Sequence, residues 1–269
     1  ASDDASGLAI ADKLRTQVTS INQGVANGNS AIALLQITDK SMAEQSKILD
    51  TIKSKLIQAN TDTTSTAGRT AIAKDITKLL QQLNNIGEQT NYNGTNLLQK
   101  ARTTLNASTE ANLTAARSAK GGLSFQIGEG TQDLIKTKTI NSNVAGLKLS
   151  ALAKAVRSGA KVSAGATAGT TGVFTRTMAQ SGQRQIDKAI TTLNGYRGDI
   201  GSTQNQVESA VRNLMTQSTN IKAAESVIRD VDYAEESANF NKLNIISQAG
   251  SYAISQSNAT QQNVLRLLQ

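Results

Sequence analysis

The side chains that enzymes most often use are absent or widely dispersed in this sequence. It contains no cysteine and no histidine, which excludes thiolate nucleophiles, Ser–His–Asp triads, disulfides and zinc sites built on Cys or His. The carboxylate pairs Asp3/Asp4 and Glu235/Glu236 suit helix starts and solvated faces better than acid–base catalysis. Because no metal or nucleotide motif is present either, the sequence predicts a protein that is not an enzyme and binds no cofactor.

Positive charge is the one chemical feature concentrated in a single stretch. Residues 101–185 hold eleven Lys and Arg against three Asp and Glu, whereas 1–100 hold ten against nine and 186–269 seven against eight. The middle therefore accounts for the net charge of +8. It indicates either a solvated exterior or adhesion to an anionic polymer such as acidic polysaccharide or host mucin. We name ten of its cations the basic surface: Arg117, Lys120, Lys136, Lys138, Lys148, Lys154, Arg157, Lys161, Arg176 and Arg184.

Two other ligand classes are not expected. Phe125 and Phe174 are the only aromatic residues of the basic middle, too few for a base-stacking platform, so no dedicated nucleic-acid partner is predicted. Near the C-terminus, residues 243–265 carry no charge, but Ser, Gln, Asn and Thr make up about half of them. Insertion into hydrocarbon would be costly, so no membrane span is predicted. Burial of this segment against other protein chains is favoured over a flexible tail.

The composition predicts that long helices position these segments. The chain has no proline to interrupt a helix, and its 3% of aromatic residues are too few to fill a thick globular core. Steps of four and three from Leu14 to Leu56 meet Leu, Val, Ile or Met at nine of thirteen positions, which predicts a coiled-coil seam on a helix ending near Asn60. Gly24 and Gly28 are expected to soften that helix, with a kink at "NGNS".

Two further helices are predicted, one with an apolar face from Ile72 to Ile86 and one that starts at Ile186 and continues to Ile228. The first and last helices have seams of similar length and are expected to pair in one antiparallel bundle. Between them, "NYNGTNLL" predicts a turn and "GGLSFQIGEGTQDLI" two short strands. From Asn141 an amphipathic helix is predicted, with apolar residues at helical spacing: Ala145, Leu149, Leu152 and Val156.

The predicted fold is therefore mainly α: an elongated antiparallel helical rod built from both chain ends, with a small α/β outer part that includes a β-hairpin. Residues 1–100 form the N-terminal half of the rod and 101–185 the variable, basic outer region. Residues 186–234 form the C-terminal half of the rod, and 235–269 a terminal helix that needs a partner to become ordered.

Several motifs resemble the two terminal blocks of bacterial flagellin. They are "ASDDASGLAIADKLRTQ" and "NYNGTNLL" in the first 100 residues, and "LNGYRGDIGSTQNQVESAVRNL", "AAESVIRDVDYAEESANFNKLNIISQAG" and "NVLRLLQ" in the last 85 or so. The resemblance implies an extracellular subunit that polymerises into the flagellar filament. Its implied partners are other copies of itself, the flagellar export apparatus with its chaperone, and the filament cap and hook-associated proteins.

The same resemblance implies a role for the C-terminal helix. In flagellins a segment of roughly forty residues precedes the "DDASGLAIA" block and pairs with that helix to form the inner tube, so this chain resembles an N-terminally shortened form. The proline that family members often carry in the last dozen residues is absent. The implied polymerisation residues are Phe240, Leu243, Ile246, Ile254, Val264, Leu265 and Leu268.

One segment resembles the flagellins of the Campylobacter and Helicobacter type, namely "SMAEQSKILDTIKSKLIQAN". Flagellins sensed by Toll-like receptor 5 carry a motif like "LQRVRELAVQA" there; its first Arg, its Glu and its second Leu fall on Thr51, Ser54 and Lys55. Poor receptor sensing is therefore expected. We use the name altered receptor segment for five residues: Asp50, Thr51, Ser54, Lys55 and Asp75.

Two alternative functions stay open at this point. One is a junction protein between hook and filament, which shares the terminal blocks and which a central region without the "FQIG" hairpin would favour. The other is a cell-surface flagellin homologue that binds acidic polysaccharide.

Overall fold

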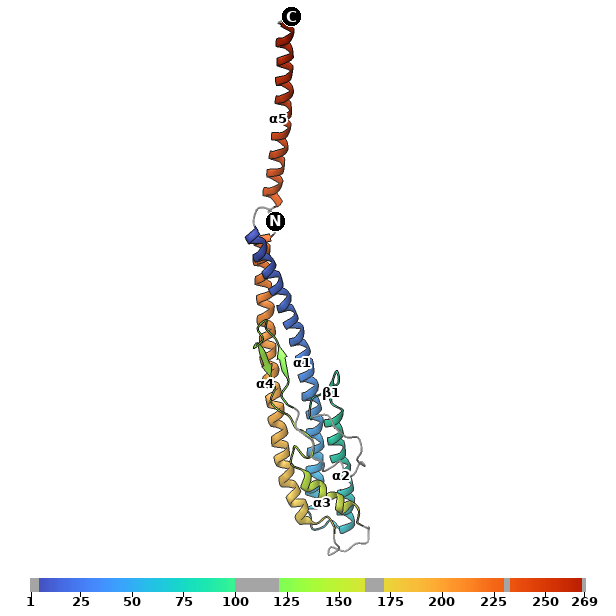
Figure 1. Ribbon diagram of the computed structural model, residues 1–269. Coiled ribbons are helices and arrows are strands. Elements are labelled where there is room, and N and C mark those ends of the chain that lie inside the picture. The colour runs from blue at the N-terminus through green and yellow to red at the C-terminus, as the bar shows by residue number, and fades with distance from the viewer. Residues whose placement is uncertain (1–4, 100–120, 163–171, 230–232, 268–269) are drawn as a thin grey trace. The chain divides into compact units, whose positions relative to one another are not determined.

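The computed structural model describes residues 5–99, 121–162, 172–229 and 233–267 (Figure 1). Three long helices dominate: α1 (Ala5–Ala59), α4 (Arg176–Arg229) and α5 (Tyr233–Leu267). The shorter helices are α2 (Thr66–Gln89) and α3 (Ser150–Ala160). Two antiparallel hairpins complete the described residues: β1 (Asn91–Tyr92) with β2 (Thr95–Asn96), and β3 (Ser124–Gln126) with β4 (Leu134–Lys136). The predicted mainly α fold with a small hairpin-containing part is confirmed. Two compact units form, residues 19–218 and residues 1–18 with 219–269.

Within the 19–218 unit, α1 and α4 pair antiparallel, as expected. Asn22 accepts a hydrogen bond from Ser218 at 3.2 Å, and Lys53 forms an ion pair with Asp187 at 2.7 Å near the other end. Between them Arg197 Nε and Nη2 donate to the two carboxylate oxygens of Asp39 at 2.8 and 3.4 Å. This forked bond raises the pKa of Arg197. Asp39 and Arg197, which interrupt the apolar seams in sequence, therefore pair with each other.

The observed seam of α1 differs from the predicted one at every second position. Ile21, Leu35 and Leu56 are buried, as the heptad steps require. The residues between them, however, lie one place earlier in sequence than predicted, at Gly24, Ala31, Thr38, Gln45, Ile52 and Ala59, all of which are buried. Five of these six are small or polar, so a search for large aliphatic residues passes over them and selects half-exposed neighbours such as Val25 and Ile32.

The two glycines of α1 mark close contacts, and α1 runs through both without interruption. A Cβ on Gly24 would lie 2.0 Å from the carbonyl oxygen of Ile127, which follows β3. A Cβ on Gly28 would lie 2.3 Å from Cγ2 of Val211 on α4. The expected softening at these positions is therefore replaced by a packing role, since only glycine lets the hairpin backbone and α4 approach this closely.

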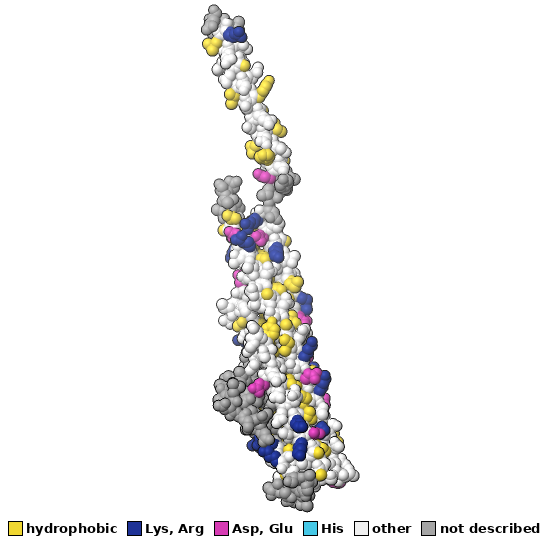
Figure 2. Space-filling model, turned by 90° about the vertical axis from the view of Figure 1, so that its right-hand side faces the viewer, with side chains coloured by type: hydrophobic (Ala, Val, Ile, Leu, Met, Phe, Trp, Pro, Cys, Tyr) yellow, Lys and Arg dark blue, Asp and Glu magenta, His cyan; other side chains and the backbone are white. Residues whose placement is uncertain are grey.

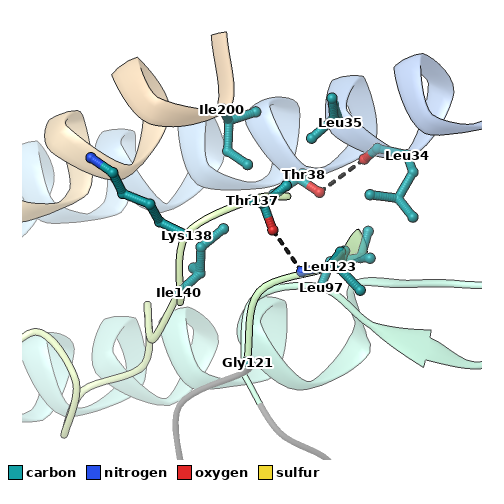
Figure 3. A pocket seen from close by; sticks show the side chains of 10 residues that line it. All are labelled: Leu34, Leu35, Thr38, Leu97, Gly121, Leu123, Thr137, Lys138, Ile140 and Ile200. Atoms are coloured by element: carbon teal, nitrogen blue, oxygen red, sulfur yellow. Dashed lines mark hydrogen bonds between the residues drawn. The ribbon is translucent and has the colours of Figure 1, made fainter. Parts of the chain in front are cut away.

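The β3–β4 hairpin is held on α1 by polar and apolar contacts. Asn27 Nδ2 donates to the carbonyl of Gln126 at 2.9 Å. Thr137 follows β4, and its hydroxyl accepts a hydrogen bond from the backbone N–H of Leu123 at 2.8 Å (Figure 3). The small space here, about 10 Å³, is lined by residues of α1, by Ile200 of α4, by Leu97 after β2 and by the residues around the β3–β4 hairpin. This volume is near the minimum for one water, so the space leaves no room for a larger ligand.

A buried polar cluster joins α1, α2 and the segment before α3. Gln45 is fully buried, and its Nε2 donates to the carbonyls of Leu83 and Ser142 at 3.1 and 2.8 Å. Asn84 Oδ1 accepts from the backbone N–H of Val144 at 2.9 Å. Because a buried backbone carbonyl or N–H is costly when unpaired, these amides fix the non-helical segment 141–149 against the bundle. The helix predicted to start at Asn141 begins only at Ser150 for this reason.

Turn chemistry sets the ends of α2. Ser65 is its N-cap, and its hydroxyl accepts from the N–H of Gly68 at 3.1 Å. Beyond the helix, Asn93 and Gly94 both have positive φ, 49° and 77°, which is the two-residue hairpin turn that an Asn-Gly pair favours. The turn predicted at "NYNGTNLL" is therefore confirmed.

Candidate assembly surfaces

The C-terminal helix α5 presents apolar side chains that its own unit leaves uncovered. Phe240 is 63% exposed and Leu243 65% exposed, and no side chain of residues 238–266 is buried or half-buried. Yellow hydrophobic patches are visible along it in Figure 2. Exposed apolar area of this extent marks an interaction surface.

Helical spacing places the predicted polymerisation residues together. Phe240, Leu243, Ile246, Ile254 and the pair Val264/Leu265 recur at intervals that return to one side of an α-helix. Leu268 lies outside the described residues. We name this side the first apolar face.

A second apolar face lies on the other side of α5 and was missed by sequence reasoning. Ile245 and Tyr252 are 66% and 73% exposed and are seven residues apart, with Ala249 between them. The strip between the two faces carries Asn244, Gln248 and other uncharged polar residues. A helix that is apolar on two sides and polar between them needs neighbours on both sides. None of the described helices is long and apolar enough to span a membrane.

The unit that contains α5 also holds the start of α1 and the end of α4. Arg229 lies 3.8 Å from Asp12 of α1 and 3.6 Å from Glu225 of its own helix. Asp12 also pairs with Arg15 at 3.2 Å. Asp12, Arg15 and Arg229 are about half exposed, so their ion pairs contribute little stability.

An exposed face of α4 lacks bulky side chains. Gly195, Gly198 and Gly201 lie three residues apart in the helix, and a Cβ on any of them would meet nothing within 4 Å. Each glycine costs a helix about 0.5–1 kcal/mol relative to alanine, and no contact with another of the described residues explains this cost. The face allows another backbone to approach closely.

The basic surface is dispersed over several elements. Lys138 pairs with Asp199 at 2.7 Å, and Arg176 forms an ion pair with Asp62. Arg176 and Arg184 lie on α4, which begins ten residues before the start expected for the C-terminal half of the rod. Figure 2 shows cations mixed with acids on the face in view rather than gathered in one patch. Lys136, Lys148 and Lys154 are exposed, and Arg157 and Lys161 lie at the end of α3; Arg117 and Lys120 lie outside the described residues.

The altered receptor segment contains an ion pair between α1 and α2. Lys55 Nζ lies 2.8 Å from Asp75 Oδ2, and this hydrogen bond is the main reason why the pKa of Asp75 is below its ordinary value. Thr51 donates to the carbonyl of Lys47, while Asp50 and Ser54 are exposed. The charge of Lys55 is therefore paired with that of Asp75 in the same subunit.

We expect Lys55→Met to raise the pKa of Asp75 toward its ordinary value, only partway because Lys78 also lowers it. Since the folded-state pKa is depressed, the pair stabilises the fold above the unfolded pKa of about 3.9, and this is lost as the pH falls through the folded pKa. The effect on stability is small because Asp75 is half exposed. An NMR titration of the Asp75 carboxyl measures the shift. Lys47→Met, which removes the exposed pair with Glu44, is the control and leaves that pKa unchanged.

Comparisons with known proteins agree with this arrangement. The family model of the bacterial flagellin N-terminal helical region matches residues 1–103, and that of the C-terminal helical region matches residues 184–268. A flagellin of Bacillus subtilis is 32% identical over the whole chain and 87% of the relative. Flagellin A of Helicobacter pylori is 27% identical over the whole chain and 92% of the relative.

A solved structure shares the fold. It is described as that of a candidate flagellar hook-associated protein from Vibrio parahaemolyticus, with a TM-score of 0.65 at 12% identity, over 84% of this chain and 98% of the other. At this identity the likeness concerns the fold alone. The two family models and the B. subtilis relative are more specific, and they place this chain in the bacterial flagellin family.

Proposed function

We infer that this protein is a structural subunit that polymerises into the extracellular filament of the bacterial flagellum and serves swimming motility. The observation that carries this conclusion is α5, a 35-residue helix with two uncovered apolar faces, in a chain that matches flagellin family models at both ends. As a member of a structural family, the protein is not an enzyme.

The physical basis of assembly is the use of different surfaces on each copy. A contact between unlike patches does not close on itself, so it repeats from subunit to subunit and generates a helical filament. The glycine face of α4 offers one site of close lateral approach, and burial of α5 among other copies removes its apolar side chains from water. Each lateral contact can be weak, because many act together along the filament.

Expression in a bacterium whose own flagellin gene has been deleted tests this function. We expect electron microscopy to show tubular filaments on the cell surface and soft-agar assays to show restored spreading. Secreted protein that remains unpolymerised would contradict the proposal.

Finer partners are also proposed. Export through a narrow channel as an unfolded chain suits a sequence without cysteine, because no disulfide can form to obstruct passage. We therefore propose the flagellar export apparatus with its chaperone, the filament cap and the hook-associated proteins as partners. The β3–β4 hairpin favours a filament subunit over a hook–filament junction protein.

We further propose that the chain is of the Campylobacter and Helicobacter type and is poorly sensed by Toll-like receptor 5. Support comes from Thr51, Ser54 and Lys55, which replace an arginine, an acid and an apolar contact. In a reporter-cell assay we expect activation at least a hundredfold weaker than that of a sensed flagellin; nanomolar activation would refute this.

A further inference from the structure

A groove of about 710 Å³ lies between the turn at residues 146–148 and one side of α4. Gln185, Lys188, Thr192 and Tyr196 line it from α4, at helical intervals that keep them on one face. Lys148 lines it from the turn. Its size and its mixture of cations, hydroxyls and one aromatic ring are those of a small-ligand site.

The charge of this groove is positive. Neither Lys148 nor Lys188 has a carboxylate within 4.0 Å among the described residues. The one acid in the lining, Asp187, is held at 2.7 Å by Lys53 of α1, which lowers its ability to neutralise the other cations. Two ammonium groups that line one groove and have no carboxylate partner among the described residues favour an anionic ligand.

The backbone holds Lys148 in place at the edge of the groove. Lys148 has a φ of 59°, which is unfavourable for a residue with a side chain. Its neighbours Leu147 and Leu149 are buried, and their backbone N–H groups donate to the carbonyls of Asn143 and Val144 at 2.9 and 2.8 Å. The backbone of the exposed lysine is therefore held between two anchored leucines before any ligand arrives, and strain of this kind is concentrated at binding sites.

The other groups in the groove suit a sugar ring. The hydroxyls of Thr191 and Thr192 donate to the carbonyls of Asp187 and Lys188, at 3.0 Å each, so their oxygens present acceptor lone pairs to sugar hydroxyls. The ring of Tyr196 is half-buried in the lining. An aromatic face of this kind packs against the apolar C–H side of a pyranose, while its hydroxyl bonds to polar groups.

We propose that this groove binds one carboxylate-bearing sugar unit of an acidic oligosaccharide. Lys148 and Lys188 bind the carboxylate, Tyr196 packs on the ring, and the threonine hydroxyls accept from its hydroxyl groups. Because the groove is open to solvent, a single site binds the sugar with low affinity. Repetition along a filament raises the overall avidity by orders of magnitude, and this step alone rests on the proposed function.

The test uses the unpolymerised full chain, so that its outcome does not depend on filament formation. Trigalacturonate is titrated against the isotope-labelled protein by NMR, with maltotriose as the neutral probe and a short polyglutamate as the acidic peptide probe. We expect saturable shifts at Lys148, Lys188 and Tyr196 with trigalacturonate and no saturable shifts with the other two. Binding of polyglutamate with equal affinity would overturn the assignment to sugars.

Matched variants separate a site from general electrostatic attraction. The double variant Lys148→Gln/Lys188→Gln is expected to weaken trigalacturonate binding at least tenfold. The control Lys154→Gln/Arg184→Gln removes the same charge from exposed residues outside the groove and is expected to change affinity less than twofold. Equal losses in both double variants would overturn the proposal. Tyr196→Phe, which keeps the ring, is expected to retain most of the affinity, whereas Tyr196→Ser loses it while circular dichroism shows an intact fold.

Discussion

Replacement of Ile246 by aspartate is expected to abolish filament assembly while leaving the subunit folded. Ile246 is 56% exposed on the first apolar face of α5, so its own subunit loses little when it is replaced. In a filament, the same position would bury a carboxylate without a partner, which costs several kcal/mol. This corresponds to a critical concentration for polymerisation at least about a hundredfold higher.

Sedimentation of filaments across a series of protein concentrations measures this effect, and circular dichroism monitors the fold. Gln248→Asp is the matched control, because it adds the same charge to the polar strip of the same helix. We expect this control to polymerise at a critical concentration within a few-fold of the parent's. If Ile246→Asp polymerised as readily, the first apolar face would not be buried in the filament.

Replacement of Gly24 by alanine is expected to have the largest effect on stability. The new Cβ would lie 2.0 Å from the carbonyl oxygen of Ile127, a backbone atom that cannot rotate away. Either α1 or the hairpin must shift, at a cost of about 2–4 kcal/mol. For a chain of this size the midpoint of thermal unfolding should fall by about 5–12 °C.

The same substitution elsewhere on a helix should have the opposite sign. Gly198→Ala adds a methyl group where nothing lies within 4 Å, and it should stabilise the subunit by about 0.5–1 kcal/mol through helix propensity. Thermal unfolding of the two variants, each as an unpolymerised subunit, compares them directly. A destabilisation by Gly198→Ala comparable with that of Gly24→Ala would show that contact with Ile127 is not the cause.

The architecture was largely predictable because helical periodicity and turn residues are local signals. The long helices, their antiparallel pairing, the Asn93-Gly94 turn and the hairpin around Gly128 follow from such signals. The half of the α1 seam at Gly24, Thr38 and Gln45 was not found, since a hydrophobic pattern does not distinguish a small residue that permits close contact from one that is solvated.

The candidate surfaces divide in the same way. The first apolar face of α5 could be read from spacing within one helix. The acidic-sugar groove could not, because its walls come from segments about forty residues apart and its charge depends on which cations find a carboxylate. Lys138 forms an ion pair with Asp199, whereas Lys148 has no carboxylate partner among the described residues. The sequence alone does not distinguish these two lysines.

The alternation of wide and narrow positions along α1 has a consequence for how this protein can diverge. Where Leu35, Leu49 and Leu56 fill the core, truncation leaves a void. A side chain would collide with Ile127 at Gly24 and with Val211 of α4 at Gly28. A saturation mutagenesis library of α1 should therefore show intolerance to smaller residues at the three leucines and intolerance to larger residues at the two glycines. Substitutions in this helix are then tolerated mainly at its outward-facing positions. The surface of the subunit can therefore diverge between lineages while the distances between its packed elements stay constant.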